Sequence, residues 1–166
     1  MTDSYRTPYN DAYESCSGTW AKLLIYPGGL DPAEVTVRLG IEATDTKLAG
    51  TRLVNSLGRE RIVKTTNWLL SSENHVKSND LRRHLDWLLE LLLPARPQIL
   101  QLQSEPKVRM SIDCVWWSRG SGGPTLWPKQ MLTMAELNLE CSFDIYFADD
   151  DTFERVPGAS SGHSRN

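Results

Sequence analysis

The clearest pattern in the chain is an alternation of apolar and polar residues over residues 108–117. Successive side chains of a β-strand point to opposite faces of its sheet, so this alternation predicts a strand with one buried face and one more polar face. The side predicted to be buried carries Val108, Met110, Ile112, Cys114 and Trp116. The other side carries Arg109, Ser111 and Asp113. We therefore expect an interior strand that places Trp116 and Trp117 on opposite faces.

Further strands are predicted at residues 19–26, 67–72 and 140–147. The first is almost continuously apolar, which indicates that both of its faces are partly covered. In the last, one face carries Cys141, Phe143, Ile145 and Phe147, and the other carries Ser142, Asp144 and Tyr146. The pattern over residues 42–60 is weak and is interpreted as a long loop or an irregular hairpin. Residues 61–65 are interpreted as an edge strand.

Four helices are predicted from apolar spacing and capping residues. The strongest covers residues 81–92, where leucines recur at spacings of three and four, with Asn79 or Asp80 as its N-cap and Pro94 after its end. A short helix after Asp31 ends at Gly40, a residue that favours the left-handed conformation of a helix C-terminus. Residues 96–103 and 128–139 give two more helices. In the last one, the residues expected to face inward are Met131, Leu132, Ala135 and Leu139.

This order of elements predicts an α+β fold, with a small mixed or antiparallel sheet and three to four helices packed mainly on one face. The length of 166 residues suits one domain. Residues 1–17 are polar and aperiodic, and residues 152–166 are rich in Ser and Gly, so both are predicted to be disordered tails. The folded domain is expected to occupy residues 18–151.

Composition argues against several partners. The formal net charge is -3, and nothing in the composition suggests a nucleic-acid-binding face, although Arg59, Arg61 and Lys64 give one region a local positive charge. No apolar run approaches the ~20 residues of a membrane span, and the N-terminus lacks the apolar core of a signal peptide. We therefore expect a cytoplasmic protein that binds neither nucleic acid nor membrane.

Patterns of catalytic and metal-binding residues are also missing from the sequence. Cys16, Cys114 and Cys141 are too widely spaced for a metal-type or redox-type pair. We expect Cys114 and Cys141, at inward positions of two predicted strands, to be buried, reduced thiols, and Cys16 lies in the predicted tail. The chain has no Gly-x-Ser-x-Gly elbow, and the Gly-rich loop at residues 120–123 lacks the Lys-Ser/Thr ending of a phosphate-binding loop. We assign no catalytic, cofactor-binding or metal-binding residue, and an enzyme is the least favoured class.

Four segments of the chain resemble an uncharacterised bacterial family, domain of unknown function 4279. They are residues 31–41, Gly50 with residues 66–72, the leucine helix ending at residues 91–94, and the closing stretch at residues 139–146. In order and spacing they span residues 19–146. The resemblance implies a small bacterial α+β domain and provides no catalytic residues to transfer. Some small domains of this kind act as immunity proteins beside bacterial toxins.

A candidate binding face follows if the last strand pairs with the strand at residues 108–117. That pairing would gather Arg109, Asp113, Trp117, Asp144 and Tyr146 on the open side of the sheet. Such a face could hold a protein partner through an aromatic anchor and acidic groups. The plainer interpretation is a solvated face with cross-strand ion pairs.

The function predicted from sequence is a non-enzymatic protein-binding module, either immunity-like or an accessory protein. The alternative is a small-molecule-sensing or regulatory domain with a pocket between sheet and helices. We expect a monomer or a weak homodimer, without a cofactor.

Overall fold

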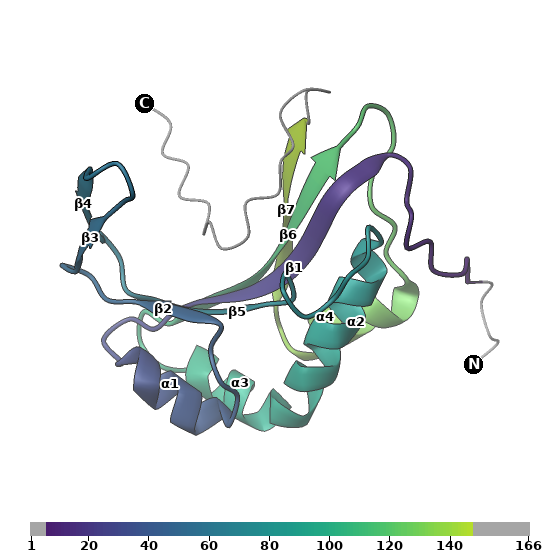
Figure 1. The fold of residues 1–166 in the computed structure, drawn as a ribbon. Helices are drawn as coiled ribbons and strands as arrows, with labels where there is room; N and C mark the ends of the chain where they lie inside the picture. Colours follow the sequence, from purple (N-terminus) through teal and green to yellow (C-terminus); the bar gives the residue numbers. More distant parts are fainter. Residues whose placement is uncertain (1–5, 148–166) are drawn as a thin grey trace.

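A curved five-stranded sheet carries α1 to α4 on one face, and no helix within residues 6–147 covers the other face (Figure 1). This computed structural model describes residues 6–147. Its elements are β1 Cys16–Tyr26, α1 Pro32–Leu39, β2 Asp45–Lys47, β3 Arg52–Val54, β4 Glu60–Ile62, β5 Asn67–Ser71, α2 Leu81–Leu92, the 3-10 turn η1 Leu93–Ala95, α3 Arg96–Gln103, β6 Arg109–Ser118, α4 Pro128–Glu136 and β7 Glu140–Phe147. The predicted α+β fold is confirmed. The predicted tail at residues 152–166 and the end of the predicted domain lie outside the described residues.

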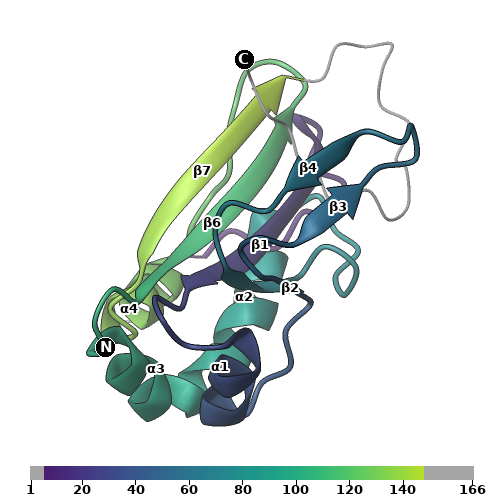
Figure 2. The same ribbon diagram turned by 90° about the vertical axis from the view of Figure 1, so that its left-hand side faces the viewer.

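The long pairing of β1 with β6 organises the sheet, whose strand order is β2-β5-β1-β6-β7. β1 is antiparallel to both of its neighbours, and its pairing with β6 runs from Cys16 opposite Ser118 to Tyr26 opposite Arg109. β7 is parallel to β6, which it reaches through α4. The sheet is therefore mixed, with β7 at one edge and the three-residue β2 at the other (Figure 2).

The alternation along β6 separates its two faces as predicted. Ile112, Cys114 and Trp116 are fully buried on the side that faces the helices. Trp117 points to the opposite side and is half-buried. Because paired residues of neighbouring strands point to the same face, Leu23 and Ile25 of β1 join the buried side.

The leucine helix α2 provides the main cover of the buried face. Its N-cap is Asp80, whose side chain accepts a hydrogen bond from the backbone N–H of Arg82. Leu85, Leu88 and Leu92 are fully buried. Each such leucine stabilises the fold by about 1.5–3 kcal/mol through removal of apolar surface from water.

The segment between α1 and β5 forms a separate hairpin. β3 and β4 pair antiparallel as a two-stranded sheet, and Gly58 adopts a positive φ of 72° in the turn between them. The hairpin rises from the β2–β5 end of the main sheet on the side without helices (Figure 1). The expected irregular hairpin is therefore present. Of the predicted edge strand at residues 61–65, only Arg61 and Ile62 belong to β4, which pairs with β3 and not with the main sheet.

The face that α4 buries differs from the prediction. Met131, Leu132 and Ala135 are exposed, and Met134 and Leu137 pack inward. The helix is turned because the Gln130 side chain is drawn into the core. Its amide nitrogen donates to two acceptors of α2: the backbone carbonyl of Arg82, at 2.9 Å, and the carboxylate of Asp86, at 2.8 Å.

A buried histidine joins α2 to the sheet. His84 Nδ1 lies 2.8 Å from Ser72 Oγ, which also accepts a hydrogen bond from the backbone N–H of Ala21 in β1. His84 Nε2 lies 2.9 Å from the Ser78 carbonyl oxygen. The Ser78 carbonyl can only accept, so Nε2 donates to it, while the single proton of the Ser72 hydroxyl is shared between Nδ1 and the Ala21 carbonyl oxygen 3.1 Å away.

Replacement of this ring should destabilise the domain strongly. We expect His84→Ala to lower the free energy of unfolding by about 2–4 kcal/mol, because it creates a cavity and leaves buried polar groups without partners. Urea denaturation measures this loss. Lys77→Ala, at an exposed loop position, is the control and should change stability by less than about 0.5 kcal/mol. Equal stability of both variants would contradict the structural role of His84.

Candidate binding face

The side of the sheet without helices, called the open face from here on, is built from alternate residues of four strands. The strand registers place the following outward residues on it: Trp20, Lys22, Leu24 and Tyr26 of β1, Asn67, Leu69 and Ser71 of β5, Arg109, Ser111, Asp113, Val115 and Trp117 of β6, and Glu140, Ser142, Asp144 and Tyr146 of β7. The sheet curves, so this face is concave, and the β3–β4 hairpin borders one end of it (Figure 1).

Two aromatic contacts mark opposite ends of the open face. Trp117 and Tyr146 stack with ring centroids 4.7 Å apart, on paired positions of β6 and β7. At the other end, the Arg109 guanidinium lies 5.4 Å from the centroid of the Tyr26 ring. Both contacts hold large side chains in fixed positions on an accessible surface, which reduces the conformational entropy that a bound partner would cost.

Acidic groups lie between the aromatic ends, toward β7. Asp113 accepts hydrogen bonds from Ser111 Oγ at 3.0 Å and from Ser142 Oγ at 2.8 Å, so it links β6 to β7. Asp144 is exposed, and no hydrogen bond or ion pair involves it within residues 6–147. Glu140, at the start of β7, is exposed as well and forms no side-chain hydrogen bond or ion pair within residues 6–147, so the carboxylates of Asp144 and Glu140 are both accessible to a partner.

The structure brings all five residues of the predicted binding face onto one surface. Pairing of Asp113 with Ser142 and of Trp117 with Tyr146 sets this arrangement, and Arg109 lies at the far end of β6. Their role in binding remains a prediction. Sequence reasoning missed the half-buried Trp20, Leu24 and Tyr26 of β1, which widen the face. The near-continuous apolar character of β1 could have indicated that this strand also places apolar side chains on the open face.

The space between the sheet and the helices is filled by side chains. Trp68, Leu85 and Ile112 meet there and are fully buried. A cavity of about 120 Å³ lies at the surface between α2 and α4, where Leu89 and Trp127 line it. Pockets for small ligands usually measure about 300–1,000 Å³, so this cavity is small for such a role.

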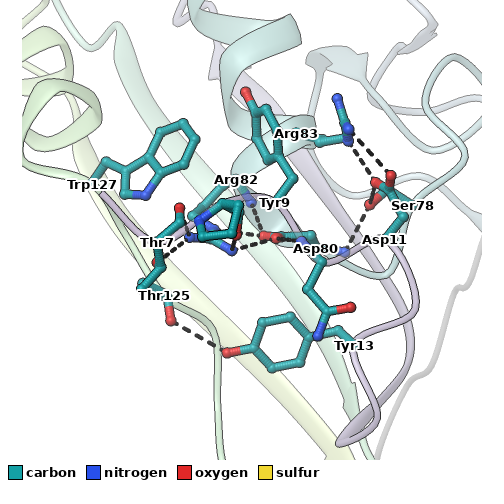
Figure 3. A network of polar contacts seen from close by, with 12 residues as sticks. Thr7, Tyr9, Asp11, Tyr13, Ser78, Asp80, Arg82, Arg83, Thr125 and Trp127 are labelled. Atoms are coloured by element: carbon teal, nitrogen blue, oxygen red, sulfur yellow. Dashed lines mark hydrogen bonds and ion pairs between the residues drawn. The ribbon is translucent and has the colours of Figure 1, made fainter. Parts of the chain in front are cut away.

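Residues 6–15 pack across the N-terminal end of α2 (Figure 3). The buried guanidinium of Arg82 donates to the backbone oxygens of Thr7 and Pro8, at 3.1 and 2.9 Å, and to the carboxylate of Asp80. The Tyr9 hydroxyl donates to Asp86, and burial together with this bond raises the pKa of Tyr9 to about 12. The sequence pattern predicts a disordered tail here, but in the structure the segment supplies acceptors that a buried cation needs.

Asp80 connects this segment to the helix. It accepts from the backbone N–H of Asn10 at 2.8 Å and from the Arg82 side chain. Burial alone would raise the pKa of Asp80, but the hydrogen bonds from Arg82 and Asn10 outweigh it and lower the pKa. The cluster of Asp80, Arg82 and residues 7–10 is therefore fully paired and has a structural role.

Two thiols meet between β6 and β7. Cys114 and Cys141 have sulfur atoms 3.7 Å apart, and both are free, as is Cys16. The hydrogen bond to Cys141 and burial raise the pKa of Cys114, so this thiol stays protonated. This agrees with the expected packing of reduced cysteines as small apolar groups.

Metal ligands do not gather in the described part of the chain. No group of three or more His, Cys, Asp or Glu residues within residues 6–147 is placed to hold a metal ion. His75 stacks on Trp87, with ring centroids 4.8 Å apart, and His84 forms the buried bridge described above. Among the helices of residues 6–147, none is both long enough and apolar enough to cross a membrane.

The lowered pKa of Asp80 predicts an acid-dependent loss of stability. A carboxyl group with a lower pKa in the folded state stabilises the fold above its unfolded pKa, and this contribution disappears as the pH falls through the folded pKa. We expect Asp80→Asn to cost about 3–5 kcal/mol at neutral pH, because Arg82 loses its buried counter-charge. Chemical denaturation should show this gap shrinking as the pH falls below about 4.

Glu136→Gln, at an exposed position of α4, controls for the loss of one negative charge. A gap between wild type and Asp80→Asn that stays constant from neutral to acidic pH would contradict the ion pair with Arg82.

Comparison with known protein families gives a match over most of the chain. The model of the family described as domain of unknown function (DUF4279) matches residues 15–148. A comparison with curated proteins and with solved structures found no match. The matched residues run from the start of β1 through the end of β7 and contain the whole open face. The chain therefore belongs to the DUF4279 family.

Proposed function

We propose that the protein is a non-enzymatic binding module whose open face covers part of a partner protein, in the manner of an immunity-like or accessory protein. The observation that carries this proposal is the stacked pair of Trp117 and Tyr146 beside the exposed Asp144. Tryptophan and tyrosine contribute strongly to binding when they are held in position on an accessible surface.

The charge of the face favours a partner with a basic surface. Asp113, Glu140 and Asp144 lie toward the β7 side of the open face. Arg109 and Lys22 lie nearer to β1. Basic groups of a partner would meet the acidic side, and the complementary charges would speed association and fix orientation.

The filled space between sheet and helices supports a surface function over an internal pocket. The buried side chains there leave the outward rings and carboxylates as the accessible chemistry. We place the module in a bacterial cytoplasm, an environment that suits its three free cysteines.

Two substitutions on the open face test the proposal. The tagged full-length protein is used to capture partners from its native lysate, and mass spectrometry identifies them. We expect Trp117→Ala to weaken binding of the captured partner by about 30-fold, the loss typical of an aromatic anchor. Asp144→Ala should slow association and reduce the dependence of binding on salt.

Controls separate binding from folding. Trp117→Phe keeps an aromatic ring opposite Tyr146 and should retain part of the affinity. Val37→Ala replaces an exposed residue of α1, on the helical side of the molecule, and should bind like the wild type. A partner whose affinity is unchanged by both Trp117→Ala and Asp144→Ala, in variants that melt like the wild type, would contradict the proposal.

A further inference from the structure

The strand β7 forms one edge of the main sheet (Figure 2) and leaves a row of large apolar side chains accessible. Phe143, Ile145 and Phe147 are 39%, 52% and 74% exposed on the side that faces the helix layer. Within residues 6–147, no strand pairs with the outer edge of β7. Edge strands of monomers are usually protected by charged side chains, proline, a bulge or a short length. β7 has eight residues and no proline, and its two charged residues, Glu140 and Asp144, both point to the open face and leave the apolar side without a charge.

We propose that this edge is an interface between two copies of the chain, which pair β7 with β7 antiparallel about a two-fold axis at Phe143. The two sheets would then join into one. This proposal rests on the outer edge of the sheet, although the outward β7 residues that the pairing opposes, Asp144 and Tyr146 among them, also belong to the open face.

Symmetry limits the possible registers to those centred on one residue. In an antiparallel pair, opposed side chains point to the same face, so each residue must oppose a residue of the same parity. A centre at Asp144 would oppose two carboxylates, and a centre at Ser142 would oppose Glu140 to Asp144. Like charges in directly opposed positions destabilise a sheet. A centre at Ile145 would pair only residues 143–147 of β7 with each other, which shortens the interface.

The register centred on Phe143 avoids these conflicts. It pairs seven of the eight residues of β7 and opposes no two like charges. Cys141 faces Ile145, and Phe143 faces its own copy, so apolar side chains meet apolar ones on the side of the helix layer. The opposed polar pairs on the other side are Ser142 with Asp144 and Glu140 with Tyr146. The Tyr146 hydroxyl can donate to Glu140 of the second copy, whereas the Ser142 hydroxyl already donates to Asp113 and only avoids a like charge opposite Asp144.

A surface depression provides a second observation for this register. It measures about 460 Å³ and is lined by Met110, Ala135, Asn138, Leu139 and Glu140. In the pairing centred on Phe143, Phe147 of the second copy comes opposite Leu139. The most exposed ring of β7 would therefore lie over this open depression, where Met110, Ala135 and Leu139 provide apolar contacts beside the polar Asn138 and Glu140.

Sedimentation equilibrium of the full-length protein tests the interface. We expect a dimer of the wild type at micromolar concentration. Phe143→Lys should raise the dissociation constant of the dimer by about tenfold or more, because it opposes two ammonium groups at the axis. Leu57→Lys, at an exposed position in the β3–β4 turn, should leave the dimer unchanged. Thermal melting checks that both variants fold.

Cross-linking tests the register. Under mild oxidation, the variant Phe143→Cys should form a disulfide between the two substituted positions of the dimer, as peptide mapping would show. The variant Ile145→Cys should form no disulfide between its two substituted positions. A wild-type protein that stays monomeric at all concentrations, or a dimer insensitive to Phe143→Lys, would overturn the proposal. If Ile145→Cys formed the disulfide between its substituted positions and Phe143→Cys did not, the register centred on Phe143 would be overturned.

Discussion

The antiparallel pairing of β1 with β6 is the constraint on which the rest of the structure depends. It runs almost the full length of both strands and fixes which side chains share a face. The buried side chains are Ala21, Leu23 and Ile25 of β1 with Cys114, Ile112 and Met110 of β6. The helices cover this side because its side chains are apolar. The open face follows directly, because it is formed by the residues that alternate with the buried ones, from Trp20 to Tyr26 in β1 and from Arg109 to Trp117 in β6. A slip of one residue would exchange the two sets.

The sequence was sufficient for the features that depend on local pattern. The alternation of β6 predicted which of its two adjacent tryptophans is buried, because strand periodicity leaves no other arrangement. The ends of α1 followed from Asp31 and Gly40, whose side-chain cap and positive φ of 67° are local properties. The part of the open face that β6 and β7 contribute followed once β7 was assumed to pair with β6.

Other features could not be predicted because they depend on contacts between distant residues. Residues 6–15 have no periodic pattern, and they are held by Asp80 and Arg82, about 70 positions away. The orientation of α4 depends on Gln130, which the helical pattern assigned to the solvent. The parallel direction of β7 and the exposure of its apolar side follow from the position of the strand in the sheet order, which spacing does not encode.

The structure rests on the division that β6 makes between side chains buried against the helices and side chains accessible on the open face. Covalent labelling of tryptophan in the native protein, followed by mass spectrometry, tests it directly. We expect Trp117 and Trp20 to react and Trp116 and Trp68 to stay protected until the protein unfolds. Protection of Trp117 equal to that of Trp116 in the free protein would show that the open face is covered, and it would contradict this division into two sides.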